Sequence, residues 1–412
     1  MRRAGLLRAA SALGLVSIAL APEGCDERAE DPCVVGPAST VLDFGGDGQA
    51  ISVDVVEEAD RTILVTWLRV DVRRVTDAGA GPGVTKLARA ERARLTKEGA
   101  LLSRSSLAIP PRLAARQGST DQVSAAWTDF GVFFRWIETT TGTLPNGQVT
   151  RSVQTVTSFV PEGGGPIVET TPAELTCSSC AITLASASTG AAVTMLASLA
   201  YGTGTTGALV LRFDARGAPA GVTPAPAFAQ PLAGAPIPVG SLVDPPGGAA
   251  QLGEERGDLF VFSPRGTYVV GPALEVRAGP LPITGPGAFV RFDAPNDVVV
   301  AGPVAGTSTG EPFVTSTTYD AKGAVRRAAR PVTRATAVGG VAPIAGGTLF
   351  VTRGESGIAL SRLDASGAKR GYDVPVPTTA TAVALVDAPP LGARLFEVVG
   401  PRVDAREVIC AP

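Results

Sequence analysis

Two of the five cysteines, Cys177 and Cys180, are separated by two serines, a spacing at which cysteines perform three kinds of chemistry. Two thiolates at this spacing supply only half of a structural zinc site, and the other cysteines stand alone in the sequence. A redox-active pair needs a helix N-terminus to lower the pKa of one thiol, and no helix is predicted here. We therefore predict a local disulfide between Cys177 and Cys180, and no metal site.

Residues 1–24 have the pattern of an export signal. Arg2, Arg3 and Arg8 form a positive segment, and residues 9–21 that follow it are apolar and uncharged. This apolar segment is too short to cross a bilayer, which needs about 20 residues. The pattern predicts a signal peptide that is removed on export to the periplasm or the cell surface.

Gly24 and Cys25 end this segment, which resembles a bacterial lipoprotein signal. The resemblance implies that Cys25 becomes the lipidated first residue and that this lipid is the only attachment to a membrane. Pro22 and Glu23 depart from the usual residues at their positions. Residues 19–21, Ala-Leu-Ala, offer the alternative of an ordinary signal-peptidase site. Pro22 would then stand directly after the cut, where such an enzyme disfavours proline. Both alternatives predict export.

With Cys25 taken as the anchor, four cysteines remain, an even number that suits a disulfide framework in an oxidising compartment. Cys177 and Cys180 are close enough to pair with each other. Cys33, near the start of the mature chain, is then left to pair with Cys410, near its end. The count thus predicts a second disulfide between the two ends of the protein.

The chain contains no histidine, which removes the commonest general base, the commonest metal ligand and the Ser-His-Asp triad. Two serines nonetheless lie in motifs of nucleophilic enzymes. Ser308 is the central residue of a G-x-S-x-G sequence, and Ser366 forms S-x-x-K with Lys369. Ser308 lies between two predicted strands rather than between a strand and a helix, and Ser366 lies in a predicted hairpin turn. We interpret both as turn residues.

Residues 202–207 match G-x-G-x-x-G, but a strand is predicted after them, so no helix N-terminus is there to bind a pyrophosphate. We predict no cofactor. Two carboxylate pairs, Asp43 with Asp47 and Asp293 with Asp297, have ligand types that calcium accepts, yet neither matches an ordered calcium loop. Turn formation explains these residues equally well.

Carboxylates are also sufficient for glycoside hydrolysis, which needs two acids about 5–10 Å apart, although no pair is singled out by the sequence. A cluster of aromatic residues could stack on a sugar, but its alternation within a strand pair favours packing in the core. These aromatic residues are Trp127, Phe130, Phe133, Phe134 and Trp136.

The composition favours an all-β protein. The 412 residues include 49 glycines and 34 prolines, with 18% charged residues, so turns must be frequent and long helices few. The net charge is −2, and it becomes −4 without residues 1–24, which argues against a nucleic-acid partner.

Short runs rich in β-branched and aromatic residues recur along the chain and predict strands. Clear examples are residues 62–70, 132–137, 208–213 and 347–352. Residues 85–96 fit either a helix or a charged strand, and we favour the strand.

A turn sequence repeats between the predicted strands. Residues 211–218 (LRFDARGA) match residues 361–368 (SRLDASGA) and 318–324 (TYDAKGA), with looser copies elsewhere. The turn glycines are spaced by 44 to 70 residues; these are Gly99, Gly147, Gly217, Gly266, Gly323 and Gly367. Each copy predicts a strand, a tight turn and a returning strand.

This repeat resembles the outer hairpin of a β-propeller blade, with four strands in each period. The resemblance implies a propeller-like domain at residues 39–412, which leaves residues 25–38 as a tether after the signal peptide at 1–24. Seven blades fit the spacing best, with six or eight as alternatives, and tandem β-sandwiches are the alternative fold. Residues 39–44 would complete the last blade beside residues 406–410, which would also bring Cys33 close to Cys410.

From these observations we expect an exported, lipid-anchored and non-enzymatic protein of the bacterial cell envelope. Its expected role is to bind or scaffold a protein or glycan partner. The alternatives are a carboxylate-dependent carbohydrate-active enzyme and a lectin-like receptor on the same scaffold.

Overall fold

The computed structural model describes residues 33–410 apart from several internal segments, and for part of the strands, including β3, β4 and β16–β21, it describes the backbone alone. The segments outside the description are 46–48, 58–62, 75–84, 116–122, 173–175, 179, 189, 202–205, 224–250, 256–257, 264–265, 271–275, 282–288, 295–296, 305–312, 321–324 and 389–391.

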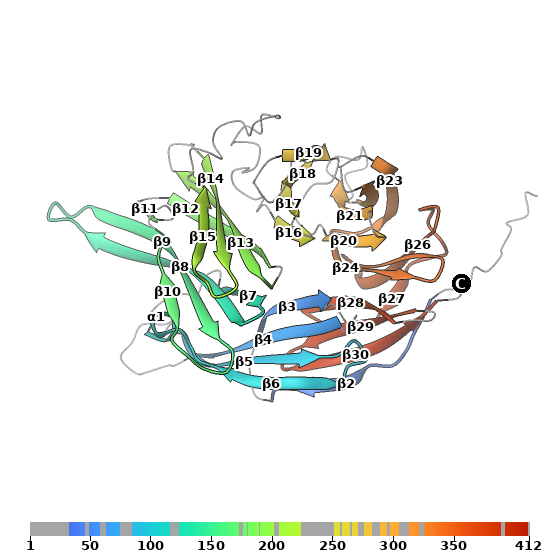
Figure 1. The fold of residues 1–412 in the computed structure, drawn as a ribbon, viewed down its shortest axis with the longest axis horizontal. Helices are drawn as coiled ribbons and strands as arrows, with labels where there is room; N and C mark the ends of the chain where they lie inside the picture. The colour runs from blue at the N-terminus through green and yellow to red at the C-terminus, as the bar shows by residue number, and fades with distance from the viewer. Residues whose placement is uncertain are drawn as a thin grey trace, which may run out of the picture.

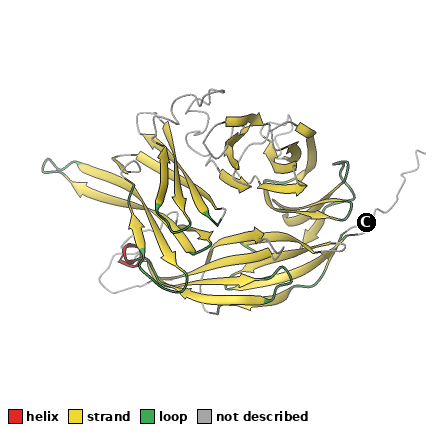
Figure 2. Ribbon diagram, in the orientation of Figure 1, coloured by secondary structure: helices red, strands yellow, loops and turns green. Residues whose placement is uncertain are grey.

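The described chain is built almost entirely from β-strands, with one short helix, α1 (Pro111–Ala115) (Figure 2). Frequent glycine and proline turns keep the strands short, and the β-branched residues between them favour extended backbone. Within the described residues, no helix is both long and apolar enough to span a membrane.

The described strands form seven antiparallel sheets, which we number along the chain (Figure 1). Sheet 1 contains β3 (Gln49–Glu57), β4 (Ile63–Arg74), β5 (Thr85–Leu95) and β6 (Leu101–Leu107). Sheet 2 contains β7 (Ser124–Thr128), β8 (Gly131–Thr143), β9 (Val149–Pro161), β10 (Val168–Thr170) and β11 (Thr176–Ser178). Sheet 3 contains β12 (Cys180–Ser188), β13 (Ala192–Tyr201), β14 (Thr206–Asp214) and β15 (Pro219–Thr223).

The next three sheets repeat the four-stranded pattern. Sheet 4 contains β16 (Gln251–Glu255), β17 (Asp258–Ser263), β18 (Gly266–Val270) and β19 (Val276–Leu281). Sheet 5 contains β20 (Phe289–Ala294), β21 (Asp297–Val304), β22 (Phe313–Asp320) and β23 (Val325–Arg334). Sheet 6 contains β24 (Ala337–Ile344), β25 (Gly347–Gly354), β26 (Gly357–Asp364) and β27 (Val374–Val376).

Sheet 7 combines both ends of the chain. Its strands are β28 (Ala382–Ala388), β29 (Gly392–Val399), β30 (Arg402–Ile409) and two N-terminal strands, β1 (Val34–Val35) and β2 (Ser39–Asp43). Both N-terminal strands pair with β30, and Ser39 lies opposite Ala405. The predicted pairing of residues 39–44 with the last strand is confirmed, but the predicted register is wrong. Residues 39–43 lie opposite 402–405, and the end of β30 pairs instead with the additional strand β1, with Val34 opposite Ile409.

The first strand of each sheet contacts the first strand of the next, in the order β3, β7, β12, β16, β20 and β24, and β28 contacts both β24 and β3. Strands within sheets 3 to 6 follow chain order, which is a meander and not the Greek-key order expected of the β-sandwich alternative. All-β structure with propeller-like sheets is thus what the described chain contains.

The hydrophobic core lies between adjacent sheets. One cluster joins sheet 2 to sheet 3 and includes Phe133 and Phe213, whose ring centroids are 4.6 Å apart. A second cluster joins sheet 7 to sheet 1 through Phe396 and Leu95. Alternating apolar residues on each strand produce these faces, because successive side chains of a strand point to opposite sides.

Several sequence predictions can be compared with these elements. The ambiguous segment 85–96 is a strand, β5, as favoured. The turns at Gly99, Gly217 and Gly367 join third and fourth strands, as in the outer hairpin of a blade.

The looser copies at Gly147 and Gly266 were assigned to the wrong hairpin, because they join the second and third strands of sheets 2 and 4. Tight turns in any hairpin favour the same glycine and asparagine residues, so turn composition alone does not say which hairpin it closes. Gly323 lies outside the described residues.

Candidate functional site

The S-x-x-K motif does not form a nucleophilic pair. The Ser366 hydroxyl donates to Asp364 Oδ1 at 2.6 Å, and Lys369 Nζ lies 2.9 Å from Asp373 Oδ1. Hydrogen bonds to Asp364 from Ser366 and Ala368, stronger than the opposing effect of partial burial, keep the pKa of this carboxyl below its usual value. These contacts stabilise the predicted turn, so Ser366 is a turn residue.

The other enzyme-like motifs are only partly within the description. A strand, β14, begins at Thr206 within the G-x-G-x-x-G sequence, which confirms that no helix follows it. Asp43 Oδ1 accepts a hydrogen bond of 2.7 Å from the Gly45 backbone, which is the expected role of a turn aspartate. Ser308, Asp47 and the side chains of Asp293 and Asp297 lie outside the described residues.

Two of the buried acidic residues in the described part of the chain are partners of arginines, and a third, Asp404, accepts a hydrogen bond from the Thr40 hydroxyl at 2.7 Å. Glu91, 1% exposed, lies 2.8 Å from Arg104, which also donates to the backbone oxygens of Asp43 and Phe44 at the end of β2. Glu397, also 1% exposed, lies 2.7 Å from Arg406. Each pair lies where two sheets meet.

Among the described residues, no three of His, Cys, Asp and Glu are grouped so that they could hold a metal ion.

The contact between sheets 1 and 2 has the same character. The Arg92 guanidinium, 1% exposed, lies 2.9 Å from Glu162 and donates to the Gly131 backbone oxygen at 3.0 Å. Arg94 reaches Glu162 as well, at 3.3 Å. Because burying one partner alone would leave an unpaired charge, these groups are suited to holding sheets together rather than to proton transfer.

The aromatic cluster is mostly core, as the strand alternation predicts. Phe133, Phe134 and Trp136 are buried, whereas Phe130 is half exposed and lies under the Arg216 guanidinium, 4.9 Å from its ring centroid. A flat aromatic surface for sugar stacking is therefore not found among these residues.

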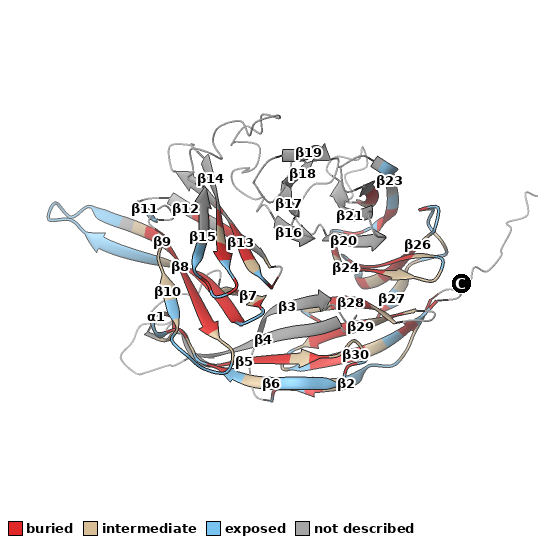
Figure 3. Ribbon diagram, in the orientation of Figure 1, coloured by how far each residue is buried: buried red, intermediate tan, exposed pale blue. Residues whose placement is uncertain are grey.

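The most exposed element of the described chain is a long hairpin in sheet 2. Strands β8 and β9 pair without interruption from Gly131 opposite Pro161 to Thr143 opposite Val149. The half nearest the core is buried, but every residue from Thr139 to Thr150 is exposed, and this end projects beyond the other sheets (Figures 1 and 3). We call residues 139–150 the arm.

The tip of the arm is a tight turn with defined hydrogen bonds. Leu144 N donates to Gln148 O at 2.8 Å, and Gly147 N donates to Leu144 O at 2.8 Å. Gly147 has a φ of +81°, a conformation that glycine adopts without steric cost. The Asn146 side chain accepts from Gln148 N at 3.0 Å. The arm is thus an ordered ribbon and not an irregular loop.

Glu138 fixes the root of the arm. Its carboxylate accepts hydrogen bonds from Trp136 Nε1 at 3.0 Å, Gln154 Nε2 at 2.9 Å and Arg112 Nη2 at 2.6 Å. Partial burial raises the pKa of Glu138, but the three hydrogen bonds and the positive charge of Arg112 outweigh it and hold the pKa below the usual 4.5. The sequence prediction missed Glu138. A single glutamate within a run of β-branched residues gives no signal of its hydrogen-bond partners.

Among the described strands, none pairs with one edge of the arm. Strand β7 pairs with β8 only from Gly131 to Arg135, and no other described strand pairs with β8 on that side. The β9 edge of the ribbon differs, because β11 pairs with β9 up to Ser152, close to the arm. Within the part of the chain that the structure describes, the backbone groups on the β8 edge of the arm therefore have no strand partner.

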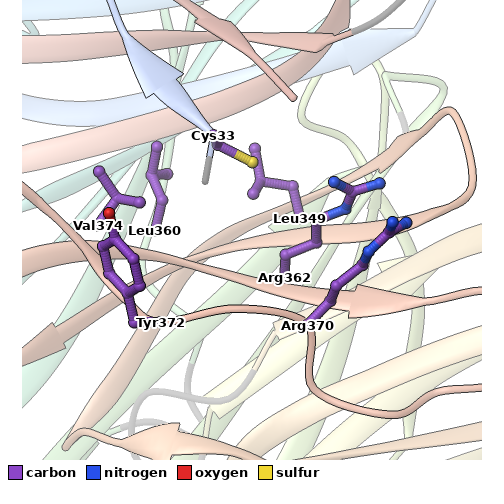
Figure 4. Close-up of a pocket in the computed structure, with 7 residues that line it drawn as sticks. All are labelled: Cys33, Leu349, Leu360, Arg362, Arg370, Tyr372 and Val374. Carbon is purple, nitrogen blue, oxygen red and sulfur yellow. The ribbon is translucent and has the colours of Figure 1, made fainter. Parts of the chain in front are cut away.

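A shallow hollow beside the Cys33–Cys410 disulfide is a second candidate (Figure 4). It is lined by Cys33, Leu349, Leu360, Arg362, Arg370, Tyr372 and Val374. Arg362 Nη2 donates to Ala345 O at 3.3 Å, and the Arg370 backbone donates to Arg362 O at 3.0 Å. The Arg362 side chain thus holds the β24–β25 turn, and the Arg370 backbone holds the segment between β26 and β27.

Cys33 and Cys410 form the disulfide predicted from the cysteine count, with Cα atoms 4.1 Å apart. Cys177 lies in β11 of sheet 2 and Cys180 lies in β12 of sheet 3, but their side chains are outside the description, so their disulfide stays a prediction. Cys25 also lies outside the described residues.

No protein family matches this sequence, and no curated protein matches it. The fold is similar to the WD40 domain of coronin from Toxoplasma gondii, with 10% identity, a TM-score of 0.42 and coverage of 92% of this chain and 90% of that domain. It is also similar to the β-propeller domain of Swd1 from Myceliophteria thermophila, with 7% identity, a TM-score of 0.41 and coverage of 90% and 99%.

A third similar structure is the β-propeller domain of the Trilobed protease from Pyrococcus furiosus. Here the identity is 7%, the TM-score is 0.34, and the match covers 68% of this chain and 78% of that domain.

Proposed function

We propose that the protein is an exported, lipid-anchored binding or scaffolding module of the bacterial cell envelope, built as a closed propeller of seven blades. The contacts of β28 with both β24 and β3, together with the pairing of β2 with β30, support the closed ring. Gly24-Cys25 after the apolar segment supports the anchor.

The arm is the single observation that carries the binding role. A ribbon whose residues 139–150 are all exposed contributes nothing to the core, yet its root is fixed by three hydrogen bonds to one carboxylate. A rigid element held away from the core is suited to contact with a partner.

The strands through which neighbouring sheets contact each other, such as β7, β12, β24 and β28, favour binding over catalysis. Among the described side chains of β7, β12, β24 and β28, Asp387 is the one carboxylate, and most of the others belong to Ala, Val and Gly. The absence of histidine and the pairing of Glu91 and Glu397 with arginines point in the same direction.

The test uses the Cys25→Ala protein, which lacks the anchor, titrated onto isolated envelope membranes. We expect saturable binding that is lost when an Asn-Gly turn joins Thr140 directly to Ser152, which lie opposite each other in the hairpin. Leu102→Ser, at another exposed apolar position, is the control and keeps the binding. Binding that survives removal of the arm would refute the role of the arm.

A parallel screen measures turnover of glycoside and phosphoester substrates with and without calcium. We expect no turnover. Turnover that a single Asp or Glu substitution abolishes would replace the binding role with an enzymatic one.

A further inference from the structure

We propose that the arm binds the arm of a second copy of this chain, by antiparallel pairing of the two β8 edges about a twofold axis. This inference deepens the proposed function, on which it rests, by naming the partner. It is carried by the unpaired edge, the residue types along it and the limits that β7 and the tip turn set on the register.

The orientation of the backbone groups follows from the hydrogen bond at the tip. Because Leu144 N donates to Gln148 O, Leu144 directs its backbone toward β9. In an antiparallel ladder this orientation alternates along the strand. Thr139, Thr141 and Thr143 therefore direct their N–H and C=O groups to the open edge, away from β9.

The edge lacks the features by which proteins prevent such pairing. Exposed edges are usually blocked by charged side chains, prolines or bulges. No charged residue occurs from Thr139 to Thr150, the β8–β9 register is unbroken, and Pro145 lies only in the tip turn. A long, uncharged edge of this kind is stable in solution when something covers it.

The residue pattern favours the same β8 edge of a second copy as the pairing partner. The three residues directed outward are all threonines, so the pattern is the same when it is reversed about Thr141. Antiparallel pairing of two copies would place Thr141 opposite Thr141, and Thr139 opposite Thr143 of the second copy. Threonine pairs of this kind are favourable across strands, and no like charges meet in the arms although the chain as a whole is negatively charged.

The neighbouring elements exclude two alternative registers. A twofold axis at Thr139 would place Thr143 opposite Arg135, whose edge is already occupied by Ser124 of β7. An axis at Thr143 would place Thr141 opposite Pro145, which has no N–H to donate. Only an axis at Thr141 places all three threonines opposite threonines of the other copy, because an axis at Thr140 would place Thr143 opposite Ile137.

A twofold pair of this type is closed, because each β8 edge is covered by the other and no further copy can be added there. The arm projects beyond the remaining sheets, so its open edge is accessible to a second copy (Figure 1). The expected assembly is a dimer joined by a four-stranded ribbon.

The first experiment measures the mass of the purified Cys25→Ala protein in solution by light scattering over a range of concentrations. We expect a dimer. Thr141→Lys places two like charges opposite each other at the axis and should weaken dimerisation by about tenfold or more. Thr150→Lys makes the same change on β9, away from the paired edge, and should leave the dimer intact.

The second experiment tests the register by oxidative cross-linking. Two Cys side chains at position 141 would have Cα atoms about 5.5 Å apart, within the span of a disulfide. Two at position 143 would be about 13 Å apart, because each opposes residue 139 of the other copy. We expect Thr141→Cys to give a covalent dimer through that position, and Thr143→Cys to give none.

A monomer at every concentration, equal loss of dimer in both lysine variants, or equal cross-linking at both positions would overturn the proposal. Failure of the proposed envelope role is separate, since the dimer is measured on purified protein. Binding of the Cys25→Ala protein to envelopes of a strain that lacks this gene would show that the arm binds a different protein or glycan, and would also overturn the second copy as its partner.

Discussion

Gly217, in the turn between β14 and β15, lies against Phe159 of β9 in the neighbouring sheet. A Cβ atom at position 217 would stand 2.3 Å from the Cβ of Phe159. Gly99 in sheet 1 has the same relationship to Val41 of β2, at 2.9 Å from Cγ1. The glycine of the repeated turn is therefore required by the packing of one sheet on the preceding one as well as by its own backbone conformation.

This contact makes a paired prediction. Gly217→Ala and Gly147→Ala both place a side chain at a positive φ, which costs about 1–2 kcal/mol. Only at position 217 does the new methyl group meet another sheet, since nothing lies within 4 Å at position 147. We expect the free energy of unfolding of Gly217→Ala to be lower by a further ~1–3 kcal/mol. Urea denaturation of both variants measures the difference, and equal values would contradict it.

Glu138 should make the stability depend on pH. Its pKa is held below 4.5 in the folded protein, so its contribution is complete above that pH and is lost as the pH falls through the folded pKa. Glu138→Gln should reduce the free energy of unfolding at neutral pH by about 1–2 kcal/mol. The loss should shrink as the pH falls through the folded pKa of Glu138, below which both side chains are uncharged. Denaturation curves at several pH values test this, and a loss that is independent of pH would argue against it.

The disulfide between Cys33 and Cys410 should contribute strongly to stability, because it closes a loop that spans 377 positions. We expect the double variant Cys33→Ala and Cys410→Ala to lose about 2–5 kcal/mol of unfolding free energy. Alanine is chosen because both positions are buried and a serine would add an unpaired hydroxyl. Denaturation with and without reductant gives the measurement, in which the variant should be insensitive to reductant.

Cys25→Ala should move the protein from the membrane fraction to a soluble fraction after cell lysis. Mass spectrometry of the first peptide of the wild-type protein should show a diacylglyceryl group on Cys25. A wild-type protein without this mass would rule out the lipid anchor and leave export as a separate matter.

The sequence was sufficient to predict the strand class, the identity of β5 and the pairing of β2 with β30. These depend on β-branched composition, turn glycines and the position of a strand at each chain end. It did not predict which hairpin the turns at Gly147 and Gly266 would close, because one turn chemistry serves several hairpins.

The arm was missed although its signal is present. The prediction ended the strand at residue 137, yet β8 continues through Thr139–Thr143, because threonines favour strands even where no core residue alternates with them. The partners of Glu138 were beyond prediction in another way. Arg112 comes from α1 and Gln154 from β9, and only tertiary packing brings them together.

The joining of both chain ends in sheet 7 has a consequence for how the chain resists mechanical tension. A pull on the residues ahead of Cys33 reaches Val34 through the backbone and Cys410 through the disulfide at the same time. The load is thus shared between β1 and β30, which pair with each other, and a strand at the edge cannot be peeled away alone. The same arrangement sets the order of assembly, since both β1 and β2 pair with β30, which is synthesised after every other described strand.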